Sequence, residues 1–502
     1  MASRPDLDQV LAAQRADKSF FGHPRGLATL FFTEMWERFS YYGMRAILIY
    51  YMTSQVARGG LGFGDSTAGS VYGLYTAMVY LLCLGGGWIA DRITGQRRAV
   101  LIGGIMIACG EFSLVLPSQT SFYIGLVLLM MGTGLLKGNV STIVGQLYAQ
   151  GDPRRDSGFS IFYMGINTGA LISPIICGYV GDRFGWRLGF GLAGVGMLAG
   201  LAIYVLGGKH LGAAGLHPAS TGDPGQDRLQ RRNAMLAVGG GLAFFALLGV
   251  LGATGAIEFT PKLIANALGY GLLAISVAVF SWLILSRGWS LVERKRSAAI
   301  LVLFVSSALF WAALEQAGSS LSLFAQRAVN RDVLGFVFPA SWYQFVEPFF
   351  VVTLAPVFAW FWLRLGRRDP SSPAKFSLAL VLVGLAFAIL IPAAAWSAGG
   401  VSVSPWWLFF TYVLQALGEL SLSPVGLSAM TKLAPERAAG FVMGIWFLST
   451  AIGNWLAGKA ASFYSSMPLP TLFGTVAVST IGAAVLLMLL IKPTVRLMSG
   501  VK

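Results

Sequence analysis

The sequence predicts an all-α membrane protein with about fourteen transmembrane helices, and three observations support this prediction. Hydrophobic residues make up 56% of the 502 residues and charged residues only 11%, whereas soluble proteins carry about 25% charged residues. Apolar runs of roughly 20 residues, long enough to cross a bilayer as a helix, recur from Leu27 to Ile491. Most Lys and Arg residues lie in short loops between these runs. This placement is typical of basic residues that set the orientation of a membrane protein. The net charge of +15 therefore does not indicate nucleic-acid binding.

An even number of helices places both chain termini on one side of the membrane. The excess of Lys and Arg on that side predicts that both termini are cytoplasmic. The polar N-terminal residues lack an apolar core followed by a small-residue cleavage site, so no signal peptide is expected. The predicted helices span residues 28–53, 66–90, 98–116, 121–145, 158–182, 186–207, 233–252, 264–285, 298–325, 339–364, 376–396, 403–432, 437–464 and 469–492.

Two loops at matching positions suggest an internal duplication. Residues 86–98, Gly-Gly-Trp-Ile-Ala-Asp-Arg-Ile-Thr-Gly-Gln-Arg-Arg, follow the second helix, and residues 362–368, Trp-Leu-Arg-Leu-Gly-Arg-Arg, hold the same place in the last six helices. The first loop resembles the signature loop of the major facilitator superfamily, whose fold is two six-helix bundles around a central cavity. The expected organisation is a cytoplasmic segment 1–27, a bundle 28–207, a linker and inserted helix pair 208–297, a bundle 298–492 and a tail 493–502.

The cysteines and histidines give no sign of a metal or redox centre. Cys83, Cys109 and Cys177 lie inside apolar spans at unrelated spacings, which is typical of small buried hydrophobic residues. All three histidines lie in loops. No cofactor is expected, and a proton carried through the membrane must bind to carboxylates.

The first helix carries an unusual set of charges. Glu34, Arg38, Tyr41 and Arg45 are spaced by four, three and four residues and so share one helix face, with Glu37 beside them. A charge at the middle of a membrane helix costs about 2.5–3.5 kcal/mol on insertion scales. The stripe is either a structural ladder of ion pairs between helices or the wall of a cavity with proton-titrating acids.

The remaining intramembrane charges are divided between the two halves of the chain. Arg38 and Lys137 are cations of the N-terminal half, while Glu315, Glu347 and Glu419 belong to the C-terminal half. Lys137 either snorkels to an interface or faces a cavity between the halves. Pro348 and Pro424 follow two of these acids, as simple kinks or as parts of gating helices. A cavity with cations on one wall and acids on the other fits a short zwitterion such as an amino acid or a peptide.

Ordered motifs over most of the chain make it resemble the proton-dependent oligopeptide transporter family of the major facilitator superfamily. The N-terminal motifs are Glu34-x-x-Glu37-Arg38-Phe39-Ser40-Tyr41-Tyr42-Gly43, Ala90-Asp91-Arg92, Gly134-x-x-Lys137-x-Asn139 and 162–169. The C-terminal motifs are Phe310-Trp311 through Glu315-Gln316, 423–428, and Trp446-Phe447-Leu448 before Gly453-Asn454.

The resemblance implies proton-coupled import of di- and tripeptides by alternating access across the bacterial inner membrane, with the monomer as the functional unit. It implies that Arg38 and Lys137 bind the peptide carboxylate and that Glu419, with Glu347, binds the amine. Glu34, Glu37 and Glu315 would take part in proton coupling, Glu315 by pairing with Lys137. The other implied peptide contacts are Tyr42, Tyr80, Asn167, Trp311, Gln344, Ser423 and Trp446.

One residue departs from the family pattern. Many relatives carry Asn where Glu347 stands. A carboxylate at this position could strengthen amine binding, titrate as a further proton site, or alter the substrate.

Two rival functions remain from the sequence. The chain could be a proton-coupled carrier of another small solute, such as nitrate or a peptide-like drug, or a peptide-sensing membrane receptor that does not transport. An enzyme is disfavoured, because the sequence shows no nucleophile–base set, phosphate loop or metal-ligand cluster.

Overall fold

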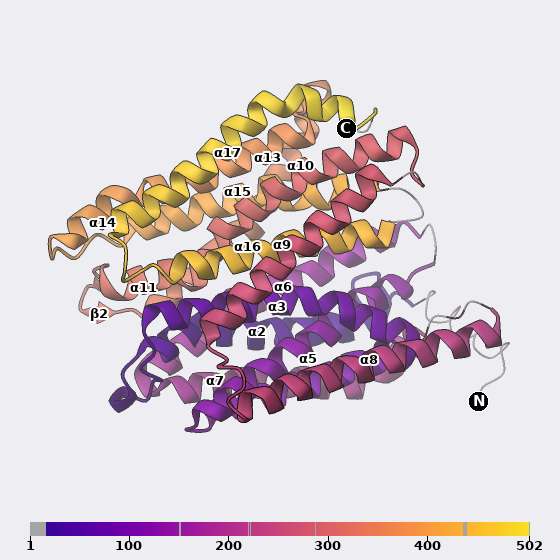
Figure 1. The fold of residues 1–502 in the computed structure, drawn as a ribbon, viewed down its shortest axis with the longest axis horizontal. Coiled ribbons are helices and arrows are strands. Elements are labelled where there is room, and N and C mark those ends of the chain that lie inside the picture. The colour runs from indigo at the N-terminus through magenta and orange to yellow at the C-terminus, as the bar shows by residue number, and fades with distance from the viewer. Residues whose placement is uncertain are drawn as a thin grey trace. The chain divides into compact units, whose positions relative to one another are not determined.

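The chain folds almost entirely into long helices, as the computed structural model shows (Figure 1). The structure describes residues 17–149, 152–218, 220, 222–286, 288–434 and 439–500. A short antiparallel hairpin, β1 (Asp332–Val333) and β2 (Phe336–Val337), is the one sheet among these residues. The helices are α2 (Arg25–Thr53), α3 (Asp65–Ile89), α4 (Gln96–Val115), α5 (Gln119–Gln146), α6 (Arg154–Phe184), α7 (Trp186–Gly207), α8 (Pro224–Ala253), α9 (Pro261–Leu285), α10 (Leu291–Leu314), α11 (Ser320–Arg327), α12 (Val346–Leu365), α13 (Ser372–Ala388), α14 (Leu390–Ala398), α15 (Trp406–Leu433), α16 (Ala439–Ala461) and α17 (Leu469–Leu497).

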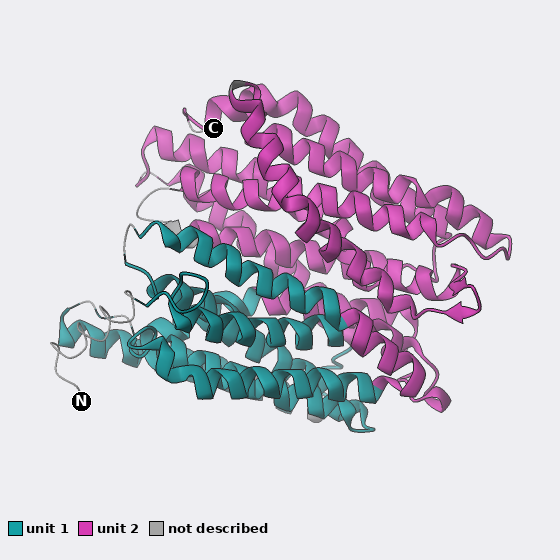
Figure 2. Cartoon of the chain, turned by 180° about the vertical axis from the view of Figure 1, so that it is seen from behind, with its two compact units in different colours: residues 1–44, 81–173, 187–260 teal, residues 45–80, 174–186, 261–502 magenta. Residues whose placement is uncertain are grey.

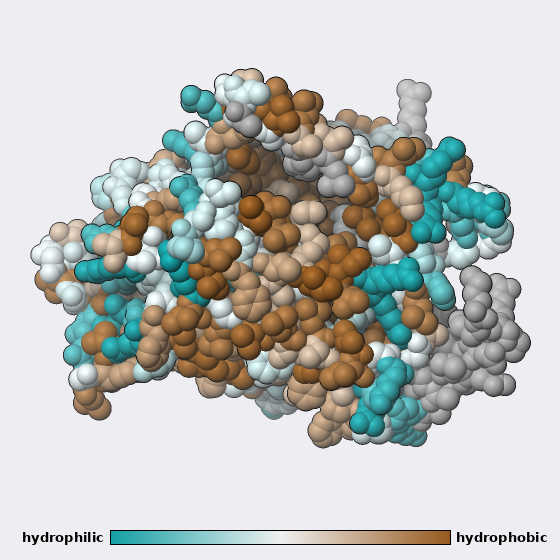
Figure 3. Space-filling view, turned by 90° about the horizontal axis from the view of Figure 1, so that it is seen from below, coloured by the Kyte–Doolittle hydropathy of each residue, from teal (hydrophilic) through white to brown (hydrophobic). Residues whose placement is uncertain are grey.

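The predicted all-α membrane fold is confirmed. Each predicted span corresponds to one helix or to consecutive helices, as where α10 continues through a 3₁₀ turn at Glu315–Gly318 into α11. Within the described residues, twelve of the helical segments are long and apolar enough to cross a membrane. On the face drawn in Figure 3, hydrophobic side chains gather in a broad area with hydrophilic ones toward its two ends. This distribution suits contact with lipid chains.

The chain forms two compact units (Figure 2). Three helices of the N-terminal half contribute to both units: α2 divides after Met44, α3 after Tyr80 and α6 after Ser173. The units therefore differ from a division into bundles 28–207 and 298–492, and that division remains a prediction. Unit 1 comprises residues 1–44, 81–173 and 187–260, and unit 2 comprises residues 45–80, 174–186 and 261–502.

Glycines let helices of unit 1 approach closely. A Cβ added at Gly132 of α5 would lie 2.6 Å from the carbonyl oxygen of Gly103 in α4. One added at Gly134 would lie 2.8 Å from the Leu82 Cβ of α3. Small residues allow such backbone approach in membrane helices. Gly132 and Gly134, shortly before Lys137, are therefore positions of close packing between α5 and its neighbours α4 and α3.

The loop at residues 86–98, which resembles the superfamily signature, makes its turn at Gly95. Gly95 has a φ of 76°, a backbone conformation that side chains disfavour. Arg97 donates hydrogen bonds to the carbonyl oxygens of Gly212 and Ala214, at 2.5 and 2.7 Å, just beyond the C-terminal end of α7. A cation at this position suits the carbonyl end of a helix.

The inserted pair consists of α8 and α9. The α8 helix begins at Pro224, nine residues earlier than the predicted span, so part of the predicted linker is helical. Asp223 caps this start by accepting a hydrogen bond from the backbone N–H of Gly225 at 2.7 Å. Only 6% of the most apolar window of α8 is buried. An apolar helix with so little burial has most of its side chains exposed, which suits contact with lipid chains.

Candidate functional site

A buried cluster of two acids and one cation lies on α2 in unit 1. Nε of Arg38 is 3.2 Å from Oε1 of Glu34. The guanidinium also contacts Glu37 twice, once through a hydrogen bond of 2.7 Å to Oε1. All three side chains are buried, and Oε2 of Glu34 has no hydrogen-bond partner in the part of the chain that the structure describes. Because one guanidinium serves two carboxylates, protonation of either acid changes the charge balance of the cluster.

Aromatic rings and a second cation border the cluster. The guanidinium of Arg38 lies 5.0 Å from the ring centre of Tyr41 and 6.0 Å from that of Tyr42, within the range of cation–π attraction. Lys137 of α5 is half-buried and close enough to act electrostatically on Glu34. Unit 1 therefore brings Glu34, Glu37, Arg38, Tyr42 and Lys137 together. Asn167 lies on α6 of the same unit, where its side-chain amide donates to the Tyr163 carbonyl at 2.9 Å.

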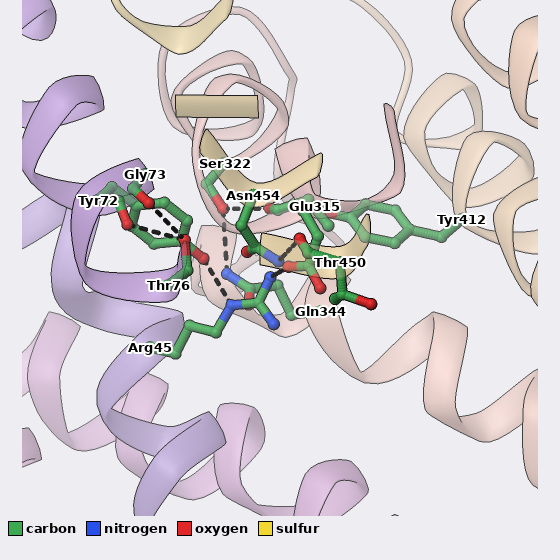
Figure 4. Close-up of polar contacts among 11 residues, drawn as sticks. Arg45, Tyr72, Gly73, Thr76, Glu315, Ser322, Gln344, Tyr412, Thr450 and Asn454 are labelled. Carbon is green, nitrogen blue, oxygen red and sulfur yellow. Dashed lines mark hydrogen bonds and ion pairs between the residues drawn. The ribbon is translucent and has the colours of Figure 1, made fainter. Parts of the chain in front are cut away.

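A second charged cluster lies in unit 2, at the end of α10. The helix stops at Leu314, and Glu315 begins a tight turn with its carboxylate directed at Arg45 (Figure 4). The two side chains form an ion pair, and Nε of Arg45 donates to the Tyr72 hydroxyl at 2.6 Å. Both charged residues are more than nine-tenths buried. The resemblance implies Lys137 as the partner of Glu315, a pairing that stays a prediction, while the structure pairs Glu315 with Arg45.

Polar groups near this ion pair connect the C-terminal end of α2 to the C-terminal helices. The amide nitrogen of Gln344 donates to Oγ of Ser322 at 3.1 Å (Figure 4). The hydroxyl of Tyr50 donates to the Ser322 carbonyl at the same distance. Tyr412 donates to the carbonyl of Ala317, in the turn that carries Glu315, again at 3.1 Å. Gln344 therefore lies in a packed polar network within unit 2.

The two remaining acids lie near each other. Glu347 lies in the first turn of α12 and Glu419 lies within α15, and the two acids are close enough to act electrostatically on each other. Pro348 lies in the first turn of α12, directly after the 3₁₀ turn Ala340–Phe345, and a kink at this proline stays a prediction. Pro424 does lie inside α15.

The other predicted contact residues are also in unit 2. A Cβ added at Gly453 would lie 2.4 Å from the Cβ of Trp311, and one added at Gly426 would lie 2.1 Å from Cη2 of the Trp446 indole. Among the described residues, Nε1 of Trp311 and Oγ of Ser423 find no hydrogen-bond partner. Tyr80 is half-buried at the end of the α3 segment in this unit.

Three features were missed from the sequence. The sequence places Arg45 on the charged face of the first helix but does not indicate that its partner is Glu315. Glu111 of α4 is fully buried, accepts a hydrogen bond from the Ser40 hydroxyl at 3.1 Å, and has an unpartnered Oε2. The position of Glu111 inside the predicted span 98–116 could have indicated a buried acid. Asp65 accepts two hydrogen bonds from Arg327, at 2.7 and 2.8 Å, and no local spacing indicates that pair.

Comparison with known proteins decides the family. The model of the POT family matches residues 97–476. The chain belongs to the POT family. Among POT relatives, the uncharacterized transporter YclF of Bacillus subtilis is 43% identical over 486 residues, covering 96% of this chain and 97% of the relative. The peptide transporter YePEPT of Yersinia enterocolitica is 40% identical over 496 residues, with 96% and 97% covered.

A solved structure agrees with these relatives. The crystal structure of a peptide transporter POT in complex with sulfate superposes with a TM-score of 0.91 at 42% identity, covering 99% of this chain and all of that one. The POT relatives and structural neighbours are transporters, so this chain is a multi-pass membrane transporter and not an enzyme. Among the residues that the structure describes, no group of three or more His, Cys, Asp and Glu could hold a metal ion.

Proposed function

We propose that this POT family member is a proton-coupled symporter that imports di- and tripeptides by alternating access. It acts as a monomer in the bacterial inner membrane, with both termini in the cytoplasm. The observation that carries the proposal is the α2 cluster, where buried Arg38 is shared by Glu34 and Glu37. Such a cluster holds acids that gain or lose a proton together with a cation that can bind a peptide carboxylate. The names of the similar transporters support a peptide as the substrate.

The residue roles follow from the family motifs. Glu34, Glu37 and Glu315 carry the coupling protons. Arg38 and Lys137 bind the peptide carboxylate, and Glu419 and Glu347 bind the amine. The remaining contacts to the peptide come from Tyr42, Tyr80, Asn167, Trp311, Gln344, Ser423 and Trp446.

Protonation acts by releasing cations. A proton on Glu34 or Glu37 removes a negative charge from Arg38, so the guanidinium becomes available to a peptide carboxylate. A proton on Glu315 weakens its ion pair with Arg45 and loosens the packing around the end of α10. Pairing and protonation oppose each other, because a nearby cation favours the ionised acid.

Uptake into proteoliposomes tests the proposal. Vesicles with an inward proton gradient should accumulate labelled Ala-Ala above the external concentration, and collapse of the gradient should abolish the accumulation. Unlabelled tripeptide should compete, whereas alanine and nitrate should not. Competition by nitrate alone would favour a carrier of another solute. Saturable binding of Ala-Ala without accumulation would favour a receptor.

A further inference from the structure

A cavity of about 600 Å³ lies in unit 2, where the loop between α12 and α13 meets the ends of α15 and α17. Its volume is typical of small-molecule binding sites. The loop and the first turn of α13 supply Asp369, Ser371 and Lys375, α15 supplies Ser428 and Lys432, and the last turn of α17 supplies Val495. None of these residues belongs to the proposed peptide contacts or to the proton-coupling acids.

The duplicated loop provides a comparison for this cavity within the same chain. In unit 1, a Cβ added at Gly95 would lie 2.9 Å from the Leu216 carbonyl oxygen. The backbone N–H of Arg97 donates to the Gly215 carbonyl at 2.9 Å, and the Gly215 N–H donates to the Gln146 side chain at 2.7 Å. The residues that follow α7 therefore fill the space between this loop and the end of α5.

The matching space in unit 2 is not filled in this way. Gly366 holds the place of Gly95 in the second loop and also has a positive φ, of 50°. A Cβ added at Gly366 meets no atom of the described chain within 4 Å. The last turn of α15 carries Lys432, whereas α5 ends at Gln146. The second loop therefore borders a cavity, and the cavity has basic side chains.

The residues that line the cavity have a net positive charge. Lys375 is more than nine-tenths buried, and its ammonium nitrogen lies 2.8 Å from Oδ1 of Asp369. Lys432 is exposed and forms no ion pair with any residue that the structure describes. Two lysines and one aspartate leave a charge of +1 in the lining. An anion with a single negative charge would balance it.

Hydrogen-bond donors lie beside the two lysines. Ser371 directly precedes the first turn of α13, but its side chain makes no capping hydrogen bond to that turn. Ser371, Ser372 and Ser428 contribute three hydroxyl-bearing side chains to the lining. The start of a helix also attracts anions through its backbone N–H groups. Such a set of donors suits an anion with several acceptor oxygens, as in a phosphate group.

We propose that this cavity binds the phosphate group of an anionic glycerophospholipid. A phosphodiester has one negative charge, which balances the charge of the lining. Pro424, Val425 and Val495 add apolar surface beside the lysines, so the cavity accepts the glycerol part together with the phosphate. Basic pockets between membrane helices on the cytoplasmic side bind lipid headgroups in this way. In the proposed orientation of the chain, this lipid comes from the inner leaflet.

The bound phosphate connects two helices. Lys375 lies on α13 and Lys432 on α15, so one phosphate with an oxygen toward each lysine bridges them. A ligand that binds only the folded chain raises its melting temperature. Phosphatidylglycerol should therefore stabilise the protein, and the stabilisation should depend on Lys432. Inorganic phosphate has the same acceptor oxygens but does not cover the apolar part of the cavity.

Lipid titration of the purified full-length protein tests the inference. Native mass spectrometry measures the binding of dioctanoyl phosphatidylglycerol to delipidated protein in detergent, and thermal unfolding follows the same titration. Lys432→Gln should bind this lipid about fivefold more weakly than the wild type, because one lysine fewer faces the phosphate. Ser428→Glu adds a carboxylate to the lining and should also weaken binding. Both positions are exposed, so the variants should fold, and their melting temperatures without lipid verify this.

A matched control and three contrary outcomes complete the test. Lys209→Gln removes an exposed lysine just beyond α7 in unit 1 and should bind phosphatidylglycerol like the wild type. Equal binding by the wild type, Lys432→Gln and Ser428→Glu would overturn the inference. Equally tight binding of phosphatidylcholine, which has no net charge, would contradict an anion site. Binding of inorganic phosphate without binding of phosphatidylglycerol would assign the cavity to free phosphate and reject the lipid.

The readout does not depend on peptide transport. Lipid binding can fail in this titration while Ala-Ala still accumulates in proteoliposomes, and the reverse result is equally measurable. Failure of this inference and failure of the proposed function are therefore distinguishable.

Discussion

Arg45 of α2 forms a buried ion pair with Glu315, which follows it by 270 residues and begins the turn at the end of α10. The partners are far apart in sequence and lie in one compact unit. The hydroxyl of Tyr72 accepts a further hydrogen bond from Arg45. This pair links the C-terminal part of α2 to the turn that precedes α11.

Replacement of Glu315 by Gln should remove proton-driven uptake. The amide keeps hydrogen-bonding capacity but cannot ionise, so it holds Arg45 as a permanently protonated acid would. Accumulation of labelled Ala-Ala in proteoliposomes should fall to the level of protein-free vesicles, while counterflow exchange should persist in part. Glu258→Gln is the control and should accumulate like the wild type. Full proton-driven accumulation by Glu315→Gln would reject the assigned role.

Two replacements of Glu111 should distinguish the contribution of its packing to stability from the contribution of its charge. Glu111→Gln retains an acceptor for Ser40 and removes a buried carboxyl with an unpartnered oxygen, so its melting temperature should equal or exceed that of the wild type. Glu111→Ala leaves a cavity and an unsatisfied Ser40 hydroxyl, and should lower stability by about 1–3 kcal/mol. Thermal unfolding in detergent measures both. A lower melting temperature for Gln than for Ala would contradict this account.

The histidine at the start of α2 should make stability depend on pH. Burial lowers the pKa of His23 below its usual 6.5, with repulsion from Arg154 adding to the effect and Asp152 opposing it. Burial also raises the pKa of Tyr148 to about 12, so its phenol stays protonated, and its oxygen lies 2.9 Å from Nδ1 of His23.

The direction of this pH dependence follows from the imidazole of His23, which is held neutral in the folded state. Above pH 6.5 His23 is neutral in both the folded and unfolded chains, and its contribution to stability is complete. As the pH falls through 6.5 and then through the lower folded pKa, the unfolded chain binds the proton first and the contribution is lost. The melting temperature should therefore fall more between pH 7.5 and pH 5 in the wild type than in His23→Gln. Equal falls would refute the prediction.

Two glycines of α3 should respond differently to alanine. A Cβ at Gly73 would lie 2.6 Å from the Cα of Gly458, whereas one at Gly87 meets no atom within 4 Å. Gly73→Ala should destabilise the protein by about 1–3 kcal/mol, because a backbone must move. Gly87→Ala should be neutral or stabilise by up to about 1 kcal/mol, since alanine favours helix. Thermal unfolding of the two variants measures the difference, and similar values would show that α3 and α16 adjust freely.

The sequence by itself determined the helices and the local cluster on α2. The length of each apolar run sets the length of a membrane helix, so a helix lies at each predicted span, although α8 begins earlier than its span. Glu34, Glu37 and Arg38 lie within one turn of the same helix, and helical geometry alone brings them together. The glycine of the first signature loop follows equally local rules.

Only the tertiary structure decided which distant residues meet. The pairs Arg45–Glu315 and Asp65–Arg327 and the contact of Gly73 with Gly458 join separate helical segments. Helical periodicity fixes the face on which a residue lies, but it does not fix the helix that packs against that face or the vertical register of the contact. These depend on the packing of side chains across helices, which no local pattern encodes.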